Sequence, residues 1–378
     1  QMDYRGYTVH ELPPNGQGIV ALMALGMLEG FDLRSHPVDG PDSLHLQIEA
    51  QKLAFADARR FVADLDYMSE VKPKDLLDKG YLRERAKLID MKRAQDFKHG
   101  TPPSGGTVYL AAADASGMMV SFIQSNFMGF GSGVVVDGIS LQNRGGTFVT
   151  AAGHPNRVGP KKRPYQTIIP GFVTKDGAPV MSFGVMGGTM QPQGHAQVMV
   201  RMADYDQSPQ AACDGPRFRF VQGMEVSVED NFPREPLEEL QRRGHRIVTI
   251  DDYNQFGSAQ LIWKLEGGYF ACTVGLSDQL VHPFLPCRLA PEIAAGIVNT
   301  ARRRCALAEI GLNHDGKWDR AYDETVRLAV EAERLGLASV WTTEHHFVDD
   351  GYMPSLAVVS AAIAAAKRSV SARRLPFS

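Results

Sequence analysis

The sequence predicts an α+β fold, because the spacing of its apolar residues changes near residue 107. Residues 41–65 place Leu, Ala and Phe at steps of three and four, which is the pattern of an amphipathic helix. From 107 to 274, short apolar runs alternate with Gly- and Asp-containing turns, as they do in β-hairpins. After about residue 275, a strand-like segment lies between helical ones, which is typical of βα units.

The first 106 residues are expected to be mainly helical. An apolar stretch of helical length follows a Pro-Pro-Asn-Gly turn and ends near Gly30, in the position of a C-terminal capping glycine. The amphipathic helix 41–65 comes next. Residues 66–100 are charged and predict short helices, and the Pro/Gly-rich segment 99–106 predicts a loop.

Strand pairs dominate the next part of the chain, and two helical segments interrupt them. The expected strand pairs are 107–124, 131–143, 167–185 and 258–274. A helix is predicted over 191–205, and a helix followed by a strand over 233–248.

Composition excludes several classes of partner. A net charge of −3 over 378 residues gives no reason to expect a nucleic acid or an anionic membrane surface. No apolar run reaches membrane-spanning length, and the N-terminus has no signal-peptide pattern. The chain starts without Met, as if within a domain, so we expect a fragment. The scattered cysteines form no CxxC motif and favour a reducing, cytoplasmic compartment in a bacterium; they are Cys213, Cys272, Cys287 and Cys305.

Thr107 follows two glycines and begins an apolar strand. A threonine hydroxyl is a good nucleophile when a base takes its proton, and the α-amine of an N-terminal threonine can be that base. Exposing the amine requires a cut between Gly106 and Thr107, and glycine tolerates the strained backbone of such a step. The alternative is a hairpin strand that starts after a Gly-Gly turn.

Acyl transfer also needs donors for a developing oxyanion. Gly187 and Gly188 lie between a predicted strand and a predicted helix, so their N–H groups are candidates for this role. A tight strand-to-helix turn is the alternative explanation of the same spacing.

Taken in order, these motifs resemble the γ-glutamyltransferase family of N-terminal nucleophile hydrolases. YRGYTVHELPPNGQG, LEGFDL and HLQIEAQKLAFADARRF resemble the end of that family's large subunit. TVYLAAADASGMMVSFIQS resembles the start of its small subunit, and KKRPYQTIIP and FGVMGGT resemble later segments. The resemblance covers about residues 1–274. It implies a four-layer αββα sandwich, cleavage before Thr107, and amide chemistry through an acyl-enzyme on that residue.

The resemblance also implies roles for individual residues. Ser125 falls where the family has a hydroxyl that supports the nucleophile, and Gly187 and Gly188 fall on its oxyanion-hole pair. Gln166 and Thr167 fall on a pair of carboxylate-binding hydroxyl residues, of which only Thr167 keeps the hydroxyl.

The segment LQNRGGTF, residues 141–148, departs from the γ-glutamyl enzymes. Acidic residues of those enzymes bind the substrate's α-amino group, and Arg144 and Thr147 stand in their place here. A guanidinium would repel an ammonium and favour a carboxylate or carbonyl oxygen. This version resembles the oxamate amidohydrolase and acylase-like branch, so we expect a small-molecule amide with an acidic acyl group; the alternative for Arg144 is a surface charge.

The last part of the chain resembles the N-terminal part of luciferase-like flavin monooxygenases, which are TIM barrels. Its Glu344-His345-His346 would lie at the end of a barrel strand, but adjacent histidines of a strand point to opposite faces, so no metal site is expected. Too few βα units are present to close a barrel. We expect a non-functional tail and no cofactor, with FMN only if the tail is functional.

These observations divide the chain into four regions and leave three functions open. The regions are 1–106, the end of the large subunit; 107–275, the small subunit that pairs with it after processing; 276–312, a junction; and 313–378, the incomplete TIM-barrel-like fragment. The first hypothesis is an autoprocessing amidohydrolase or acyltransferase. The alternatives are a flavin-dependent monooxygenase that uses the tail, and an inert, unprocessed precursor fragment.

Overall fold

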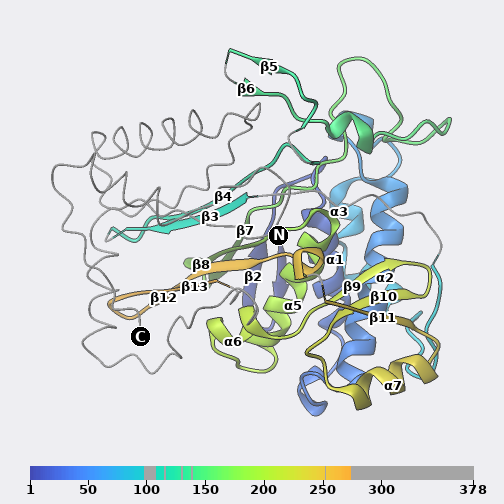
Figure 1. The fold of residues 1–378 in the computed structure, drawn as a ribbon, viewed down its shortest axis with the longest axis vertical. Coiled ribbons are helices and arrows are strands. Elements are labelled where there is room, and N and C mark those ends of the chain that lie inside the picture. Colours follow the sequence, from blue (N-terminus) through green and yellow to red (C-terminus); the bar gives the residue numbers. More distant parts are fainter. Residues whose placement is uncertain (98–107, 115, 129–130, 138, 252, 274–378) are drawn as a thin grey trace. The chain divides into compact units, whose positions relative to one another are not determined.

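The computed structural model describes residues 1–97, 108–114, 116–128, 131–137, 139–251 and 253–273 (Figure 1). Gly106 and Thr107 lie outside these residues, as do the junction and the predicted βα units of the tail. The described helices and strands confirm the mixed α+β composition.

The main sheet has six strands in the order β1-β2-β7-β8-β12-β13, and each strand is antiparallel to its neighbours. The strands are β1 Met2–Tyr4, β2 Tyr7–His10, β7 Gly171–Lys175, β8 Ala178–Val185, β12 Ala259–Leu265 and β13 Gly268–Thr273. The hairpins predicted over 167–185 and 258–274 are therefore confirmed. The sheet also contains strands from both sides of residue 107.

The first 97 residues are mainly helical, as expected, but they also form the short hairpin β1–β2, which the sequence did not predict. Tyr4 and Val9 are fully buried in the main core, and β2 pairs with β7, more than 160 residues away. Strands of three and four residues are too short to show an alternating pattern, so only the tertiary pairing reveals them.

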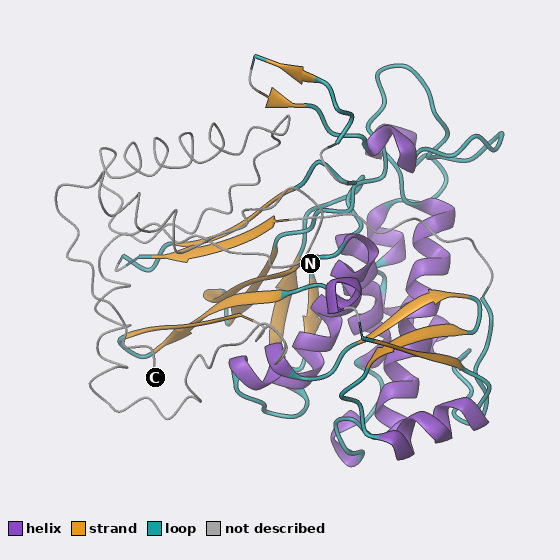
Figure 2. Ribbon diagram, in the orientation of Figure 1, coloured by secondary structure: helices purple, strands orange, loops and turns teal. Residues whose placement is uncertain are grey.

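Helices pack against one face of the main sheet (Figure 2). Those that contact the sheet are α1 Gly18–Leu28, α5 Gln191–Ala203 and α6 Pro209–Asp214. Helices α2 Pro41–Phe61 and α4 Lys79–Ala86 pack on α1, and α3 Pro73–Leu76 lies beside α4. Helix α1 packs against both α2 and α5, and all of its residues except Gly26 are buried. This environment explains why the sequence of α1 is apolar on every side.

Alternate residues of β8 show what covers each face of the sheet. Phe183 faces α5, since its ring lies 4.6 Å from the ring of His195. Gly184 belongs to the opposite face of the sheet. A Cβ built on Gly184 would lie 2.3 Å from Cδ2 of the Tyr109 ring, so this ring covers the opposite face. Tyr109 belongs to the hairpin of β3 Val108–Ala113 and β4 Met119–Gln124, which the sequence predicted. The described layers are thus helices, sheet and hairpin, and the four-layer αββα arrangement remains a prediction.

A smaller sheet, in the order β11-β10-β9, packs on α2 and α7 Arg234–Arg242. Its strands are β9 Phe218–Gln222, β10 Glu225–Glu229 and β11 Arg246–Ile250. The sequence predicted α7 and β11 but assigned neither β9 nor β10. A short hairpin, β5 Val135–Val136 and β6 Ile139–Ser140, confirms the strand pair expected over 131–143. Single 3₁₀ turns lie at Leu33–Ser35, Leu65–Tyr67, Arg144–Thr147, Gly188–Met190 and Tyr253–Phe256. Among the helices described, none has both the length and the apolar character that crossing a membrane requires.

Candidate active site

Arg144 brings together three of the residues predicted from separate motifs. It begins the 3₁₀ turn Arg144–Thr147 and is only 2% exposed. Its Nη1 donates to Thr167 Oγ1 at 2.6 Å, and its Nη2 donates to the carbonyl of Ser125 at 3.2 Å. The guanidinium lies over the Phe127 ring, 5.4 Å from its centroid. Arg144 is therefore buried at the centre of the candidate site, and the surface-charge alternative is wrong.

Ser125 lies beside the start of β3. Val108 pairs with Gln124 in the hairpin, so the first described residue after Thr107 lies opposite the neighbour of Ser125. Ser125 Oγ accepts the N–H of Phe127 at 2.9 Å, and Phe127 has a φ of +81°. A positive φ at an aromatic residue is strained, and such strain is common at functional sites.

Gln17 links this cluster to the paired glycines, and the sequence analysis missed it. Its Nε2 donates to the carbonyl of Thr167 at 2.6 Å and to the carbonyl of Gly188 at 2.7 Å. Its backbone N–H donates to the carbonyl of Gln166 at 2.9 Å. Gln17 is fully buried. One side chain from the region before residue 107 therefore fixes two segments of the region after it.

The paired glycines adopt backbone angles that only glycine takes readily. Gly187 has a φ of +116° and Gly188 a φ of +58°. The carbonyl of Gly187 accepts the N–H of Met190 at 2.9 Å, which orients the peptide whose N–H belongs to Gly188. Among the described residues, no acceptor takes the N–H of Gly187 or of Gly188. Within the described part of the chain, both N–H groups are therefore open to an oxygen that becomes negative.

Gly257 supports this turn from a neighbouring segment and was also missed. A Cβ built on Gly257 would lie 1.8 Å from the carbonyl oxygen of Met186, and one on Gly187 would lie 3.1 Å from the Cα of Gly257. The N–H of Met186 donates to the carbonyl of Ser258 at 3.0 Å. The two backbones thus touch without any side chain between them.

Thr147 and Gln166 contribute to the same segment through internal hydrogen bonds. Thr147 Oγ1 lies 2.8 Å from the carbonyl oxygens of both Arg144 and Tyr165. Gln166 Oε1 accepts the N–H of Thr167 at 3.1 Å. These contacts hold the 3₁₀ turn next to the segment that carries Thr167. The role of Thr147 and Gln166 in binding substrate stays a prediction.

A second polar cluster lies within the fold, away from these residues. His45, Glu49 and His245 are buried, and their possible metal-ligating atoms lie within 4.8 Å of one another. The ammonium of Lys52 donates to Glu49 Oε1 at 2.7 Å and lies 3.3 Å from His245 Nδ1. A positive charge already fills this position, so the cluster does not fit a metal ion.

The hydrogen bonds of this cluster define one proton arrangement. The three ammonium protons of Lys52 have three acceptors, namely Glu49 Oε1, the carbonyl of Gln95 at 3.1 Å, and His245 Nδ1. His245 Nε2–H then donates to His45 Nδ1 at 2.8 Å, and His45 Nε2–H donates to the carbonyl of Asp90 at 2.9 Å. Both imidazoles are neutral in this arrangement, which joins α2 to the start of β11.

Acid is expected to destabilise the fold through these histidines. Burial lowers the pKa of His45 to about 4 and that of His245 to about 2, below the value of 6.5 for a free histidine. Below pH 6.5 the unfolded chain therefore binds more protons, and stability falls as the pH drops towards these folded-state values. Urea unfolding measured from pH 7 to pH 4 should show this loss, with a shallower slope for His245→Gln. Equal slopes for the two proteins would contradict the neutral arrangement.

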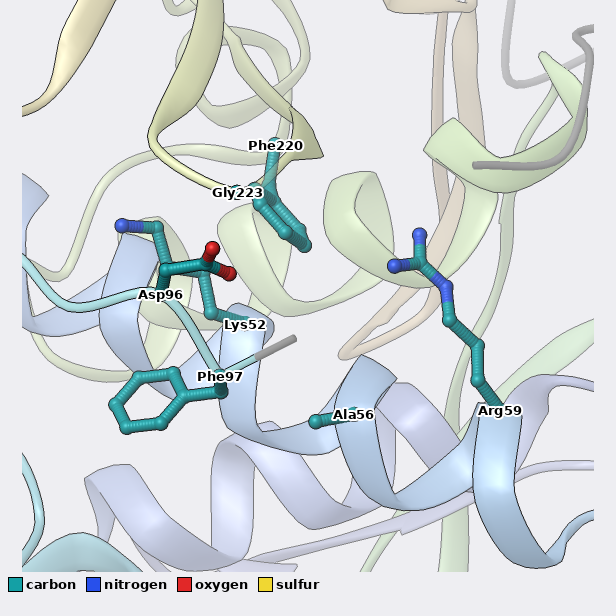
Figure 3. A pocket seen from close by; sticks show the side chains of 7 residues that line it. All are labelled: Lys52, Ala56, Arg59, Asp96, Phe97, Phe220 and Gly223. Carbon is teal, nitrogen blue, oxygen red and sulfur yellow. The ribbon is translucent and has the colours of Figure 1, made fainter. Parts of the chain in front are cut away.

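A small hollow adjoins Lys52 on α2 (Figure 3). It is lined by Lys52, Ala56, Arg59, Asp96, Phe97, Phe220 and Gly223. The Phe220 ring lies 5.7 Å from Arg59 Cζ and 6.0 Å from Lys52 Nζ. None of the predicted site residues lines this hollow, so we place the candidate active site at Arg144 and the paired glycines.

Matches to known protein families span most of the chain. Residues 1–280 match the family described as Gamma-glutamyltranspeptidase, and residues 296–371 match the family described as Luciferase-like monooxygenase. The chain is 35% identical over 275 residues to the glutathione hydrolase-like YwrD proenzyme of Bacillus subtilis (strain 168), a match that covers 71% of this chain and 52% of that protein. It is 31% identical over 255 residues to the oxamate amidohydrolase proenzyme of Klebsiella pneumoniae, covering 66% and 48% of the two proteins.

A solved structure resembles the fold as well. The crystal structure of cephalosporin acylase from Bacillus halodurans matches with 49% sequence identity and a TM-score of 0.68, and the match covers 73% of this chain and 50% of the acylase. The chain spans about half the length of the curated relatives it matches.

Proposed function

The chain belongs to the gamma-glutamyltranspeptidase family, and from this premise we propose that it is an N-terminal nucleophile enzyme that cleaves amides through an acyl-enzyme on Thr107. In this proposal the chain cuts itself between Gly106 and Thr107. The resulting large and small subunits stay paired, because strands from both sides of the cut share the main sheet.

One observation supports the proposal: two buried side chains connect Ser125, Thr167 and the paired glycines, which come from separate segments. Arg144 bonds to Ser125 and Thr167, and Gln17 bonds to Thr167 and Gly188. Strand β3 begins beside Ser125, one residue after the proposed nucleophile.

The chemistry follows from these groups. The α-amine of Thr107, with a reference pKa of about 8, takes the hydroxyl proton, and the oxygen attacks the amide carbonyl. The N–H groups of Gly187 and Gly188 stabilise the oxyanion. The C–N bond breaks, the leaving amine takes the proton, and water or a second amine then attacks the ester of Thr107.

Self-cleavage uses the same oxygen in an earlier step. The Thr107 hydroxyl attacks the carbonyl of Gly106, and the acyl group moves from the nitrogen to the oxygen. This shift breaks the C–N bond and frees the α-amine. Water then hydrolyses the ester, which restores the Thr107 hydroxyl and leaves a carboxylate on Gly106.

No cofactor takes part in this proposal. The match of residues 296–371 to the luciferase-like family supports a second candidate function, a flavin-dependent monooxygenase reaction in which FMN would be bound by that segment. Its test is flavin released from the purified protein by denaturation; a protein without flavin would contradict this candidate.

The amide proposal is tested with a panel of acyl p-nitroanilides, by following the release of p-nitroaniline. The purified chain should release it, Thr107→Ser should retain part of the activity, and Thr107→Ala should lose it. Equal release by the chain and by Thr107→Ala would overturn the proposal.

Replacing Gln17 with leucine is expected to impair turnover and stability together. The change leaves the buried carbonyls of Thr167 and Gly188 without this donor, at about 1–3 kcal/mol for each unsatisfied group. Urea unfolding and the kcat for the best p-nitroanilide should both fall.

Gln197 provides a matched control for Gln17. It is also buried and also donates to two backbone carbonyls, those of Gln193 at 3.2 Å and Phe218 at 2.9 Å. Gln197→Leu should lower stability while the kcat of the folded protein is unchanged. If both variants lose kcat alike, Gln17 has no specific role in positioning the site.

A further inference from the structure

A buried pair of side chains, Glu11 and His195, is bonded to the strand that leads into the paired glycines. Both side chains are fully buried, and His195 Nδ1 lies 2.6 Å from Glu11 Oε1. The other ring nitrogen, Nε2, accepts the backbone N–H of Val185 at 3.1 Å. Val185 is the last residue of β8, and only Met186 separates it from Gly187. The pair therefore contacts the strand end at which the glycine turn begins.

The N–H of Val185 determines which nitrogen of His195 carries the proton. A backbone N–H can only donate, so Nε2 presents its lone pair and the ring proton lies on Nδ1. Nδ1–H then donates to Glu11 Oε1, which makes the carboxyl group the partner that selects this tautomer. Glu11 Oε2 is buried and has no hydrogen-bond partner in the described part of the chain, so the carboxyl group is held there by His195.

Val185 lies where the sheet leaves one N–H without a strand partner. Gly171, the first residue of β7, pairs with Phe183, so Val185 extends past that pairing. On its other side, Val185 pairs with Ala259 of β12. The imidazole takes the place of the missing strand, and a buried N–H without an acceptor would be costly. His195 therefore fixes the one edge of this strand end that β7 does not reach.

Glu11 and Gln17 together hold both ends of the turn that carries the paired glycines. Gln17 donates to the carbonyl of Gly188, at the end of the turn. Glu11 acts through His195 on Val185, at its start. The two residues lie on either side of the Pro-Pro-Asn-Gly sequence that precedes α1. One short segment therefore controls the direction of the N–H groups between these two anchors.

We propose that Glu11 is a positioning residue for the oxyanion donors, and that it acts by holding His195 as the neutral Nδ1–H tautomer whose Nε2 fixes the N–H of Val185. This role rests on the proposed function, because the donors matter only if an oxygen becomes negative beside them. Neither side chain touches the reacting atoms. Misplaced donors weaken the transition state more than the bound substrate, so the effect falls on kcat.

The proton positions can be measured without any turnover. In the purified chain labelled with ¹⁵N-histidine, a long-range ¹H–¹⁵N spectrum at pH 7 distinguishes protonated from unprotonated ring nitrogens. The signals of His195 are those that His195→Gln removes. Nδ1 should appear protonated and Nε2 unprotonated, and Glu11→Leu should introduce the other tautomer. The opposite tautomer in the unaltered chain, or two protonated nitrogens, would overturn the inference.

Turnover of the best p-nitroanilide tests the positioning role. Glu11→Leu should lower kcat about ten- to 100-fold and leave KM nearly unchanged, because the donors act mainly in the transition state. Glu11→Gln should retain most of the kcat, since its amide oxygen can still accept from Nδ1–H. His195→Leu should lower kcat as Glu11→Leu does. His195→Gln should restore part of it, because its amide oxygen can accept the N–H of Val185.

Glu229 provides the matched control for Glu11. It is also a buried carboxyl group with a buried partner, Arg217 at 3.2 Å, but it lies on β10 of the smaller sheet. Glu229→Leu should lower the urea midpoint of unfolding while the kcat of the folded protein is unchanged. Equal losses of kcat in Glu229→Leu and Glu11→Leu would overturn the positioning role. If Glu11→Leu does not fold, equal kcat values for His195→Leu and His195→Gln would overturn it instead.

The two proposals can fail separately. If the unaltered chain cleaves amides and Glu11→Leu keeps its kcat, the proposed function stands and the positioning role is wrong. If the unaltered chain cleaves no amide, the proposed function fails, and the nitrogen signals alone decide whether Glu11 and His195 hold the end of β8.

Discussion

Replacing Gly257 with alanine is expected to abolish most amide turnover and to destabilise the fold. The new Cβ would lie 1.8 Å from the carbonyl oxygen of Met186, a backbone atom that moves only with its peptide. That peptide carries the N–H of Gly187, one of the two proposed oxyanion donors. Losing one such donor costs about 10²- to 10³-fold in kcat, so turnover of the best p-nitroanilide should fall by about that factor.

Gly267 supplies the control for this substitution. It has a φ of +82°, close to the +67° of Gly257, but a Cβ there meets nothing within 4 Å. Gly267→Ala therefore carries the backbone strain, about 1–2 kcal/mol, without the collision. Its kcat should equal that of the unaltered protein. Equal kcat values for the two variants would show that the contact with Met186 does not position the Gly187 N–H.

Replacing Lys52 with methionine is expected to cost about 3–5 kcal/mol of stability, because it leaves a buried carboxylate uncompensated. Lys52 and Glu49 are 1% and 0% exposed at their side chains and lie 2.7 Å apart. The substitution also removes the ammonium that donates to His245 Nδ1. The hydrogen bonds of His245 and His45 then no longer have a single fixed direction. Urea unfolding at pH 7 measures the loss directly.

Lys87 and Glu84 form a pair with the same spacing on the surface. Their charged atoms also lie 2.7 Å apart, but each side chain is 69% exposed. Lys87→Met should leave the free energy of unfolding unchanged within error, because water compensates an exposed charge. A similar loss in both variants would mean that the buried cluster contributes no more than an ordinary surface pair.

Local patterns predicted many of the elements correctly. The apolar spacing of 41–65 identified α2, and the turn sequences identified the hairpins β3–β4, β7–β8 and β12–β13. The hairpin β1–β2 was missed because it is stabilised by pairing with β7, which is distant in sequence. Strands β9 and β10 were missed although Val226 and Val228 alternate with polar residues. Their core includes Leu44 and Ile48 of α2, which is likewise far along the chain.

In the candidate site, too, local patterns predicted some residues, and others depend on contacts between distant segments. Gly187 and Gly188 could be predicted, because adjacent glycines between a strand and a helix form a recognisable motif. Gln17 and Gly257 could not, because their roles depend on contacts with Thr167, Gly188 and Met186 that no local pattern encodes. The charge of Arg144 was visible in the sequence, but its burial without a described counter-ion appears only in three dimensions.

The central claim is that Thr107 becomes a new N-terminus, and intact mass spectrometry of the denatured protein tests it most directly. The purified chain should give two fragments whose masses meet between Gly106 and Thr107, and Thr107→Ala should give one uncut chain. A single uncut chain from both proteins, or cleavage that persists in Thr107→Ala, would contradict the claim.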